Sequence, residues 1–185
     1  METYFNIASP KFVINKMAII KTLLGKTPIF GKDCFISETS AIIGDVIMGE
    51  NCSVWFSAVV RGDVNTIRIG SNTNIQDCAC IHATFETGPT NIGNNVSIGH
   101  NATVHACTIE DGALIGMGAT LLDGCRIGKQ AIVAAGSLVL SNTKIGDEEL
   151  WAGVPAKFIK KTKEGQAISF AKNYLLYKEW YEQEK

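Results

Sequence analysis

Apolar residues recur every six positions along most of this 185-residue chain, and this period constrains the fold more than any other feature. Twenty positions of the series are apolar: Phe30, Ile36, Ile42, Met48, Val54, Val60, Ile69, Ile75, Ile81, Ile92, Ile98, Val104, Ile109, Ile115, Leu121, Ile127, Val133, Val139, Ile145 and Trp151. The spacing shifts three times, after Asn65, Glu86 and Thr108. Neither an α-helix nor an alternating strand has this period.

A second stripe of small or slim side chains follows the apolar positions by four residues. Its members are Cys34, Ser40, Val46, Cys52, Ala58, Val64, Thr73, Ala79, Val96, Ala102, Ala113, Ala119, Cys125, Ala131 and Ser137, and Phe85 is the main exception. A coil with three flat faces, each six residues long, explains both stripes, because the apolar residues point inward and the small residues fit tight corners.

This pattern resembles the hexapeptide-repeat family of left-handed parallel β-helices over residues 30–156. The resemblance implies an all-β triangular prism of six to seven coils, and its left hand comes from the family rather than from the period. We expect residues 1–29 to be an N-terminal extension and lead-in, with a second possible start at Met17. Residues 157–185 are predicted to contain a C-terminal α-helix, from about Glu164 to Glu182, that packs on the prism.

Composition argues against several functions and locations. The 17 Lys and Arg residues nearly balance the 18 Asp and Glu residues, so binding to nucleic acid or to an anionic membrane through bulk charge is not expected. No apolar run approaches the length of a membrane-spanning helix, and the N-terminus does not resemble a signal peptide. We therefore predict a cytoplasmic protein whose six cysteines are reduced thiols.

Counting in coils of three hexads brings two histidines together. On one face, the residues that follow the apolar positions point outward and include Arg61, His82 and His105. His82 and His105 are separated by one coil plus the inserted residues around 86–91, so we expect them on neighbouring strands roughly 4.8 Å apart. Two imidazoles at that separation can share one metal ion. The three breaks of the period follow this same face, as expected for a functional corner.

The third histidine, His100, falls on the preceding face and points away from that pair, so it can join them only from another copy of the chain. The outward residues Ile43, Leu122 and Leu140 on the histidine face also require a covering neighbour. A three-sided prism suits cyclic threefold symmetry. We expect a homotrimer with one metal site in each interface, and the alternative is three unrelated surface imidazoles.

A set of motifs narrows the resemblance to the γ-class carbonic anhydrases. The motifs are Arg61-Gly62-Asp63, Asn74-Ile75-Gln76-Asp77, His82, and His100 with His105. The resemblance implies that His82 and His105 of one chain and His100 of the next bind Zn²⁺, with Fe²⁺ or Co²⁺ as other possible metals. It implies a carbonate dehydratase-type lyase that hydrates CO₂ reversibly to bicarbonate with metal-bound hydroxide, because zinc lowers the pKa of its water to about 7. No organic cofactor is expected.

The same resemblance implies roles for five residues around the metal. Gln76 matches the amide that accepts from the bound hydroxide and donates to substrate, and Asn74 is a weaker candidate for the same role. Arg61, with Asp63 and Asp77, matches an inter-subunit ion pair that supports the ligands. A purely structural ion pair is the alternative.

The chain departs from the family pattern at the residues that export protons. The prototype enzymes have a Glu after the Arg-Gly-Asp motif and an acidic loop, whereas this chain has Val64 and a short loop over residues 85–91 with only Glu86. The resemblance therefore implies metal binding but not fast turnover. Tyr174 of the C-terminal helix either compensates at the site or packs on the prism, and we favour packing.

The cysteines have structural interpretations at this stage. Cys34, Cys52 and Cys125 occupy inward corner positions and are expected in the core. The Cys78-Ala79-Cys80 motif lies beside His82, and we interpret it as local packing because a metal with three histidine ligands does not need it.

Two other functions stay open. Many hexapeptide-repeat proteins are acetyl-CoA-dependent acyltransferases, which generally use one histidine base in an extended loop and need space for a pantetheine arm. This chain has no long loop, and the metal site accounts for its histidines. A non-catalytic metal-binding homologue is the other possibility, because the expected Glu is absent.

Overall fold

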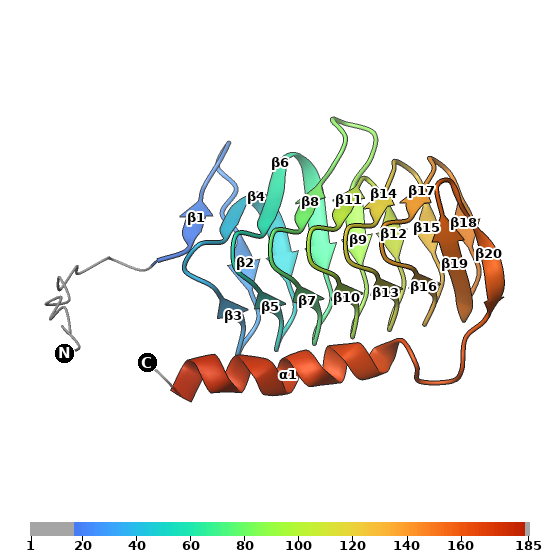
Figure 1. The fold of residues 1–185 in the computed structure, drawn as a ribbon. Coiled ribbons are helices and arrows are strands. Elements are labelled where there is room, and N and C mark those ends of the chain that lie inside the picture. Colours follow the sequence, from blue (N-terminus) through green and yellow to red (C-terminus); the bar gives the residue numbers. More distant parts are fainter. Residues whose placement is uncertain (1–16, 184–185) are drawn as a thin grey trace, which may run out of the picture.

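The computed structural model describes residues 17–183, in which the chain winds into about seven stacked turns with one α-helix along the side (Figure 1). This arrangement confirms the predicted parallel β-helix with a C-terminal helix. Residues 1–16 of the predicted N-terminal extension lie outside the described residues. Within residues 17–183, no helix is long and apolar enough to cross a membrane.

Two faces of the prism merge into one 12-stranded sheet, because β4 and β6 are long enough to turn the corner between them. Its strands are β1 (Ile19–Lys21), β2 (Ile29–Phe30), β4 (Ala41–Met48), β6 (Val59–Ile69), β8 (Cys80–His82), β9 (Thr90–Ile92), β11 (Thr103–His105), β12 (Thr108–Ile109), β14 (Thr120–Leu121), β15 (Arg126–Ile127), β17 (Leu138–Val139) and β18 (Lys144–Ile145). The face that contains β8 and β11 is called the histidine face below.

The third face is an eight-stranded sheet. Its strands are β3 (Phe35–Ile36), β5 (Ser53–Val54), β7 (Asn74–Ile75), β10 (Ser97–Ile98), β13 (Leu114–Ile115), β16 (Ile132–Val133), β19 (Glu149–Gly153) and β20 (Ala156–Lys161). All its pairs are parallel except β19 with β20, which closes the last coil as an antiparallel pair. The sequence analysis did not predict β20.

The α-helix α1 (Ile168–Gln183) starts slightly later than predicted and runs back along the eight-stranded face toward the first coils (Figure 1). It contacts β5 and β10, so the predicted packing of the helix on the prism is confirmed. Because α1 runs back along the prism, the residues near the middle of the helix lie close to the corner that contains His100.

The prism interior is filled by the six-residue series. Seventeen of its twenty residues are buried, and Phe30, Ile36 and Trp151 at the two ends are partly buried against the same core. One expectation for the second stripe is wrong. The pairing of β4 with β6 shifts register after Gly44, so the buried neighbour of Val46 is Ile67, whereas Val64 is half-buried.

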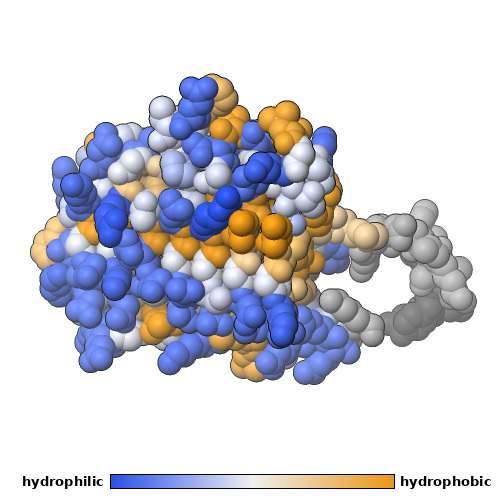
Figure 2. Space-filling model, turned by 180° about the vertical axis from the view of Figure 1, so that it is seen from behind, coloured by the Kyte–Doolittle hydropathy of each residue, from blue (hydrophilic) through white to orange (hydrophobic). Residues whose placement is uncertain are grey.

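The outer surface retains apolar side chains that a single chain does not cover. Leu140 is exposed, and Ile43 and Leu122 are half-buried. Figure 2 shows a band of apolar residues between polar margins on the back of the molecule. Burying that band would require another surface, which is consistent with the predicted covering neighbour.

Candidate metal centre

His82 and His105 lie opposite each other on β8 and β11, which pair in parallel register. Their ring centroids are 5.1 Å apart, and His82 Nδ1 lies 3.1 Å from His105 Nε2. The predicted stacking of these two histidines is confirmed. The two inner nitrogens therefore face each other across neighbouring coils.

A carboxylate holds the outer nitrogen of each ring. His82 Nε2 lies 2.9 Å from Asp63 Oδ1, and His105 Nδ1 lies 2.7 Å from Asp123 Oδ1. Because a carboxylate accepts hydrogen bonds, each outer nitrogen carries the proton and each inner nitrogen of a neutral ring presents a lone pair.

This donor geometry fits a shared cation. Two lone pairs that face each other at 3.1 Å repel unless a proton or a metal ion lies between them. Two tetrahedral ligand nitrogens, each about 2.0–2.1 Å from Zn²⁺, are roughly 3.3 Å apart. The carboxylates behind the rings also match the outer-shell partners that metal-binding histidines usually have.

The supporting residues come from the irregular corner beside the histidine face. Asp63 lies where β6 shifts register, and the Arg61 guanidinium donates to its carboxylate. Partial burial acts to raise the pKa of Asp63, but the hydrogen bonds from His82 and Arg61 outweigh it and hold this pKa below its ordinary value. Within the chain, Arg61 thus supports a residue that orients a histidine.

Asp123 was not among the predicted site residues. The Thr84 hydroxyl donates to it, and this bond together with the one from His105 lowers the pKa of its carboxyl despite partial desolvation. Counting coils from His105 leads to Leu122, because β11 pairs Val104 with Leu121 of β14, and Asp123 is the next residue along the chain.

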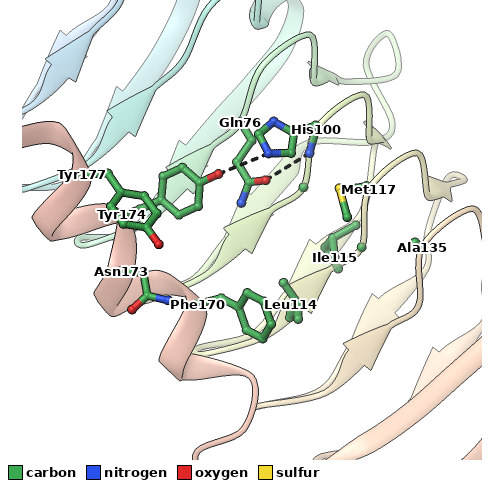
Figure 3. A pocket seen from close by; sticks show the side chains of 12 residues that line it. Gln76, His100, Leu114, Ile115, Met117, Ala135, Phe170, Asn173, Tyr174 and Tyr177 are labelled. Carbon is green, nitrogen blue, oxygen red and sulfur yellow. Dashed lines mark hydrogen bonds between the residues drawn. The ribbon is translucent and has the colours of Figure 1, made fainter. Parts of the chain in front are cut away.

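His100 lies away from this pair, near α1. Its Nδ1 is 2.7 Å from Asp77 Oδ2, and the Tyr174 hydroxyl lies 3.3 Å from its Nε2 (Figure 3). Because Nδ1–H donates to Asp77, the Nε2 lone pair is available to a donor or a metal. Among the described residues, no group of three potential ligands gathers in one place. As predicted, His100 cannot join His82 and His105 within one chain.

Gln76 and Asn74 belong to the His100 side of the chain. The backbone N–H of His100 donates to Gln76 Oε1 at 3.2 Å, and Gln76 Nε2 donates to Asn74 Oδ1 at 3.0 Å. Asn74 in turn donates to Ser97 Oγ at 2.9 Å. Both side chains are almost fully buried, so this chain of bonds fixes the orientation of the Gln76 amide.

A cavity of about 400 Å³ lies between α1 and the prism beside Gln76 and His100 (Figure 3). Its apolar wall includes Leu114, Met117 and Phe170. Tyr174 packs edge-on against Trp55, with ring centroids 5.2 Å apart, so the favoured packing role is confirmed. Its hydroxyl also contacts His100, and compensation for the absent Glu stays a prediction. Burial and the nearby charge of Asp77 raise the pKa of Tyr174 to about 12.

The interpretation of Cys78 and Cys80 as locally packed residues is wrong, because both are exposed in the single chain. Cys80 precedes the inward Ile81 and therefore points outward, on the same face as His82. Cys52 and Cys125 are buried as predicted, and Cys34 is half-buried.

Comparison with known proteins agrees with this architecture. The family described as "Bacterial transferase hexapeptide (six repeats)" matches residues 89–123 and 106–141. The chain is 38% identical to a hexapeptide transferase family protein from Anaplasma phagocytophilum, with a TM-score of 0.83 over 88% of this chain and 98% of that one.

Two relatives have more specific names. "Gamma carbonic anhydrase 2, mitochondrial" of Arabidopsis thaliana is 45% identical over 88% of this chain, which spans only 61% of that protein's length. Its name places that relative in mitochondria, and the cytoplasmic location of this chain stays a prediction. "Probable carbonic anhydrase" of Methanocaldococcus jannaschii is 44% identical over 80% of this chain and 93% of its own length. The chain therefore belongs to the γ-class carbonic anhydrase family of hexapeptide-repeat proteins.

Proposed function

We propose that this protein is a metalloenzyme that catalyses the reversible hydration of CO₂ to bicarbonate at the interfaces of a homotrimer. The observation that supports it best is the pair of inner nitrogens of His82 and His105, 3.1 Å apart, whose outer nitrogens are held by carboxylates. Neutral imidazoles are preferred ligands of Zn²⁺, and they also suit Fe²⁺ and Co²⁺.

The third ligand in this proposal is His100 of the partner subunit. Its Nδ1 is occupied by Asp77, so Nε2 is the nitrogen that would bind the metal in place of the Tyr174 hydroxyl. When bound by three imidazoles, such an ion supplies a water of near-neutral pKa as the nucleophile for CO₂.

The remaining residues orient these ligands and the substrate. Asp63 and Asp123 keep the rings in the tautomer whose inner nitrogen can bind metal, and Arg61 holds Asp63. Gln76 Oε1 accepts one bond from the His100 backbone and can accept a second, so it is the polar group of the cavity best suited to orient substrate or water.

A mixed-subunit experiment tests both the metal and the shared site. We expect about one metal per chain in the wild type and loss of metal and of CO₂ hydration in His100→Ala and in His82→Ala/His105→Ala. Trimers assembled from both variants should regain metal, because some interfaces then contain one intact half from each chain. Stopped-flow hydration by the zinc and anaerobic iron forms measures turnover. Lack of metal under every loading condition, or no recovery in mixed trimers, would contradict the proposal.

Acyl transfer is the second candidate, because the Anaplasma relative is described as a transferase and an apolar cavity lies beside His100. If this candidate is right, the protein should bind acetyl-CoA or consume it, and His82→Ala should retain this activity. A non-catalytic homologue would instead bind metal between subunits without hydrating CO₂. The same set of variants separates the three functions.

A further inference from the structure

Two pairs of cysteines stack on successive coils of the prism. Cys34 and Cys52 immediately precede β3 and β5, which pair in register from Phe35 and Ser53 onward. Neighbouring strands are about 4.8 Å apart, a Cα separation that a disulfide can bridge.

The second pair provides an internal comparison. Cys107 and Cys125 immediately precede β12 and β15, which also pair in parallel. Both of these thiols are buried, with 2% and 1% exposure. Cys52 is equally buried, but Cys34 is only half-buried. Only the Cys34–Cys52 pair therefore combines a thiol that a reagent can reach with a second thiol behind it.

A buried cation lies over the first pair. Lys178 of α1 is 5% exposed, and its Nζ donates to the backbone oxygen of Asp33 at 2.5 Å and to Asn51 Oδ1 at 3.3 Å. Both acceptors are neutral, and Lys178 has no carboxylate in ion-pair contact within residues 17–183. A buried ammonium without an anionic partner favours a nearby thiolate.

The electrostatics of the two pairs differ accordingly. The neighbouring Cys52 thiol, which can donate to a Cys34 thiolate, lowers the pKa of Cys34 to about 7. Lys178 also lowers this pKa, whereas burial and the Asp33 charge act to raise it. The neighbouring Cys34 and burial raise the pKa of Cys52. In the second pair, the bond to Cys125 and burial raise the pKa of Cys107.

We propose that Cys34 and Cys52 form a thiol–disulfide exchange site, in which Cys34 is the attacking thiolate, Cys52 is the resolving thiol and a small-molecule disulfide is the oxidant. The Cys34 thiolate attacks one sulfur of the oxidant, which forms a mixed disulfide and releases one thiolate. Cys52 then attacks Cys34 Sγ, loses its proton and releases the second thiolate. Two protein thiols are oxidised, one disulfide is reduced, and the protons pass to the released thiolates.

The resulting disulfide would cross-link the first two coils beneath α1. Each thiol now donates to a backbone oxygen, Cys34 to Gly49 at 3.2 Å and Cys52 to Gly70 at 3.0 Å, so oxidation exchanges two weak bonds for one covalent link. The site is independent of the proposed metal centre, and its test does not require metal or CO₂.

Oxidised glutathione is the probe for the test, applied to the full chain in a Cys78→Ser/Cys80→Ser background that removes the two exposed thiols. We expect peptide mapping to find a Cys34–Cys52 disulfide that dithiothreitol reverses, while Cys107 and Cys125 stay reduced. In Cys52→Ser, Cys34 should stop at the mixed disulfide with glutathione. Circular dichroism establishes that each variant is folded.

Alkylation rates test the role of the cation. At pH 7, Lys178→Met should slow the alkylation of Cys34 by iodoacetamide about threefold, whereas Lys178→Arg should retain the rate. Folded protein in which glutathione leaves Cys34 unmodified, equal oxidation of the Cys107–Cys125 pair, or an unchanged rate in Lys178→Met would each overturn the proposal.

Discussion

Two stretches of the same prism are built from one repeat but differ in regularity. Residues 109–151 keep the six-residue period without a break, and their strands pair in steps of three hexads, as in Leu121 with Val139. Residues 59–109 are interrupted three times. There, Val60 pairs with Ile81, and Ile81 pairs with Val104. Paired residues are therefore further apart in the sequence than in the regular stretch.

The interrupted stretch provides most of the polar groups of the candidate centre, and the regular stretch adds Asp123. Asp63 comes from the shifted part of β6, and Thr84 comes from the loop that the Thr84–Gly88 bridge closes. The inward residues of both stretches are buried, except Trp151 at the end of the regular stretch, which is partly buried. The comparison indicates that the regular repeat contributes mainly to stability and that the interrupted stretch contributes most of the functional groups. Variants can separate these two contributions.

The largest effect on stability is expected from the regular stretch. Ile127 is fully buried, so Ile127→Ala should lower the free energy of unfolding by about 2–5 kcal/mol through lost burial and a cavity. Urea denaturation measures this loss. Metal content per folded chain should not change. Loss of metal from folded Ile127→Ala would show that the two stretches are not separable.

The largest effect on metal affinity is expected at Asp123, the residue of the regular stretch that supports a histidine of the interrupted stretch. Asp123→Ala removes the acceptor that orients His105, so metal affinity in chelator competition should fall about 10- to 100-fold. Asp111→Ala is the matched control, because Asp111 also precedes a glycine with positive φ but accepts from the Asn94 backbone instead of a histidine. Equal losses of affinity in both variants would contradict the proposed role of Asp123.

A smaller, pH-dependent effect is expected at the end of the regular stretch. The Trp151 indole N–H donates to Glu149 at 2.9 Å and, with Gly146 and Lys161, lowers the pKa of Glu149. A depressed folded-state pKa adds stability above the unfolded-state pKa, and this stability is lost as the pH falls through the folded-state value. Glu149→Gln should therefore cost about 1 kcal/mol at pH 7 and less in acid. A cost that grows in acid would contradict this assignment.

Sequence reasoning predicted the scaffold well because the period of six reports directly on which side chains face inward. It also predicted that His82 stacks on His105, because counting residues by coils shows which residues of neighbouring strands pair. It did not predict β20, which follows the last position of the six-residue series. It also did not predict the buried role of Ile67, because the break after Asn65 shows that the spacing changes but not which residue then faces inward.

The supporting contacts of the candidate centre were harder to predict for a different reason. Counting one coil from His105 leads to Leu122, and the neighbouring Asp123 reaches the histidine from the corner that follows β14. The contact between Tyr174 and His100 depends on the direction in which α1 returns along the prism, and no repeat encodes that direction. The exposure of Cys80 could have been predicted, because the inward Ile81 follows it, whereas the exposure of Cys78 depends on the corner geometry around Ala79.

The smallest effect concerns this helix contact. The Tyr174 hydroxyl donates to the same His100 nitrogen that the proposed metal would need, and at 3.3 Å the bond is weak. Tyr174→Phe should therefore raise metal affinity only about threefold, since the metal no longer displaces a donor worth about 0.5–1.5 kcal/mol. Tyr177→Phe, which lines the same cavity, is the control, and chelator competition is the measurement. A lower affinity in Tyr174→Phe would mean that the hydroxyl supports the occupied site, and the helix would then belong to the centre rather than compete with it.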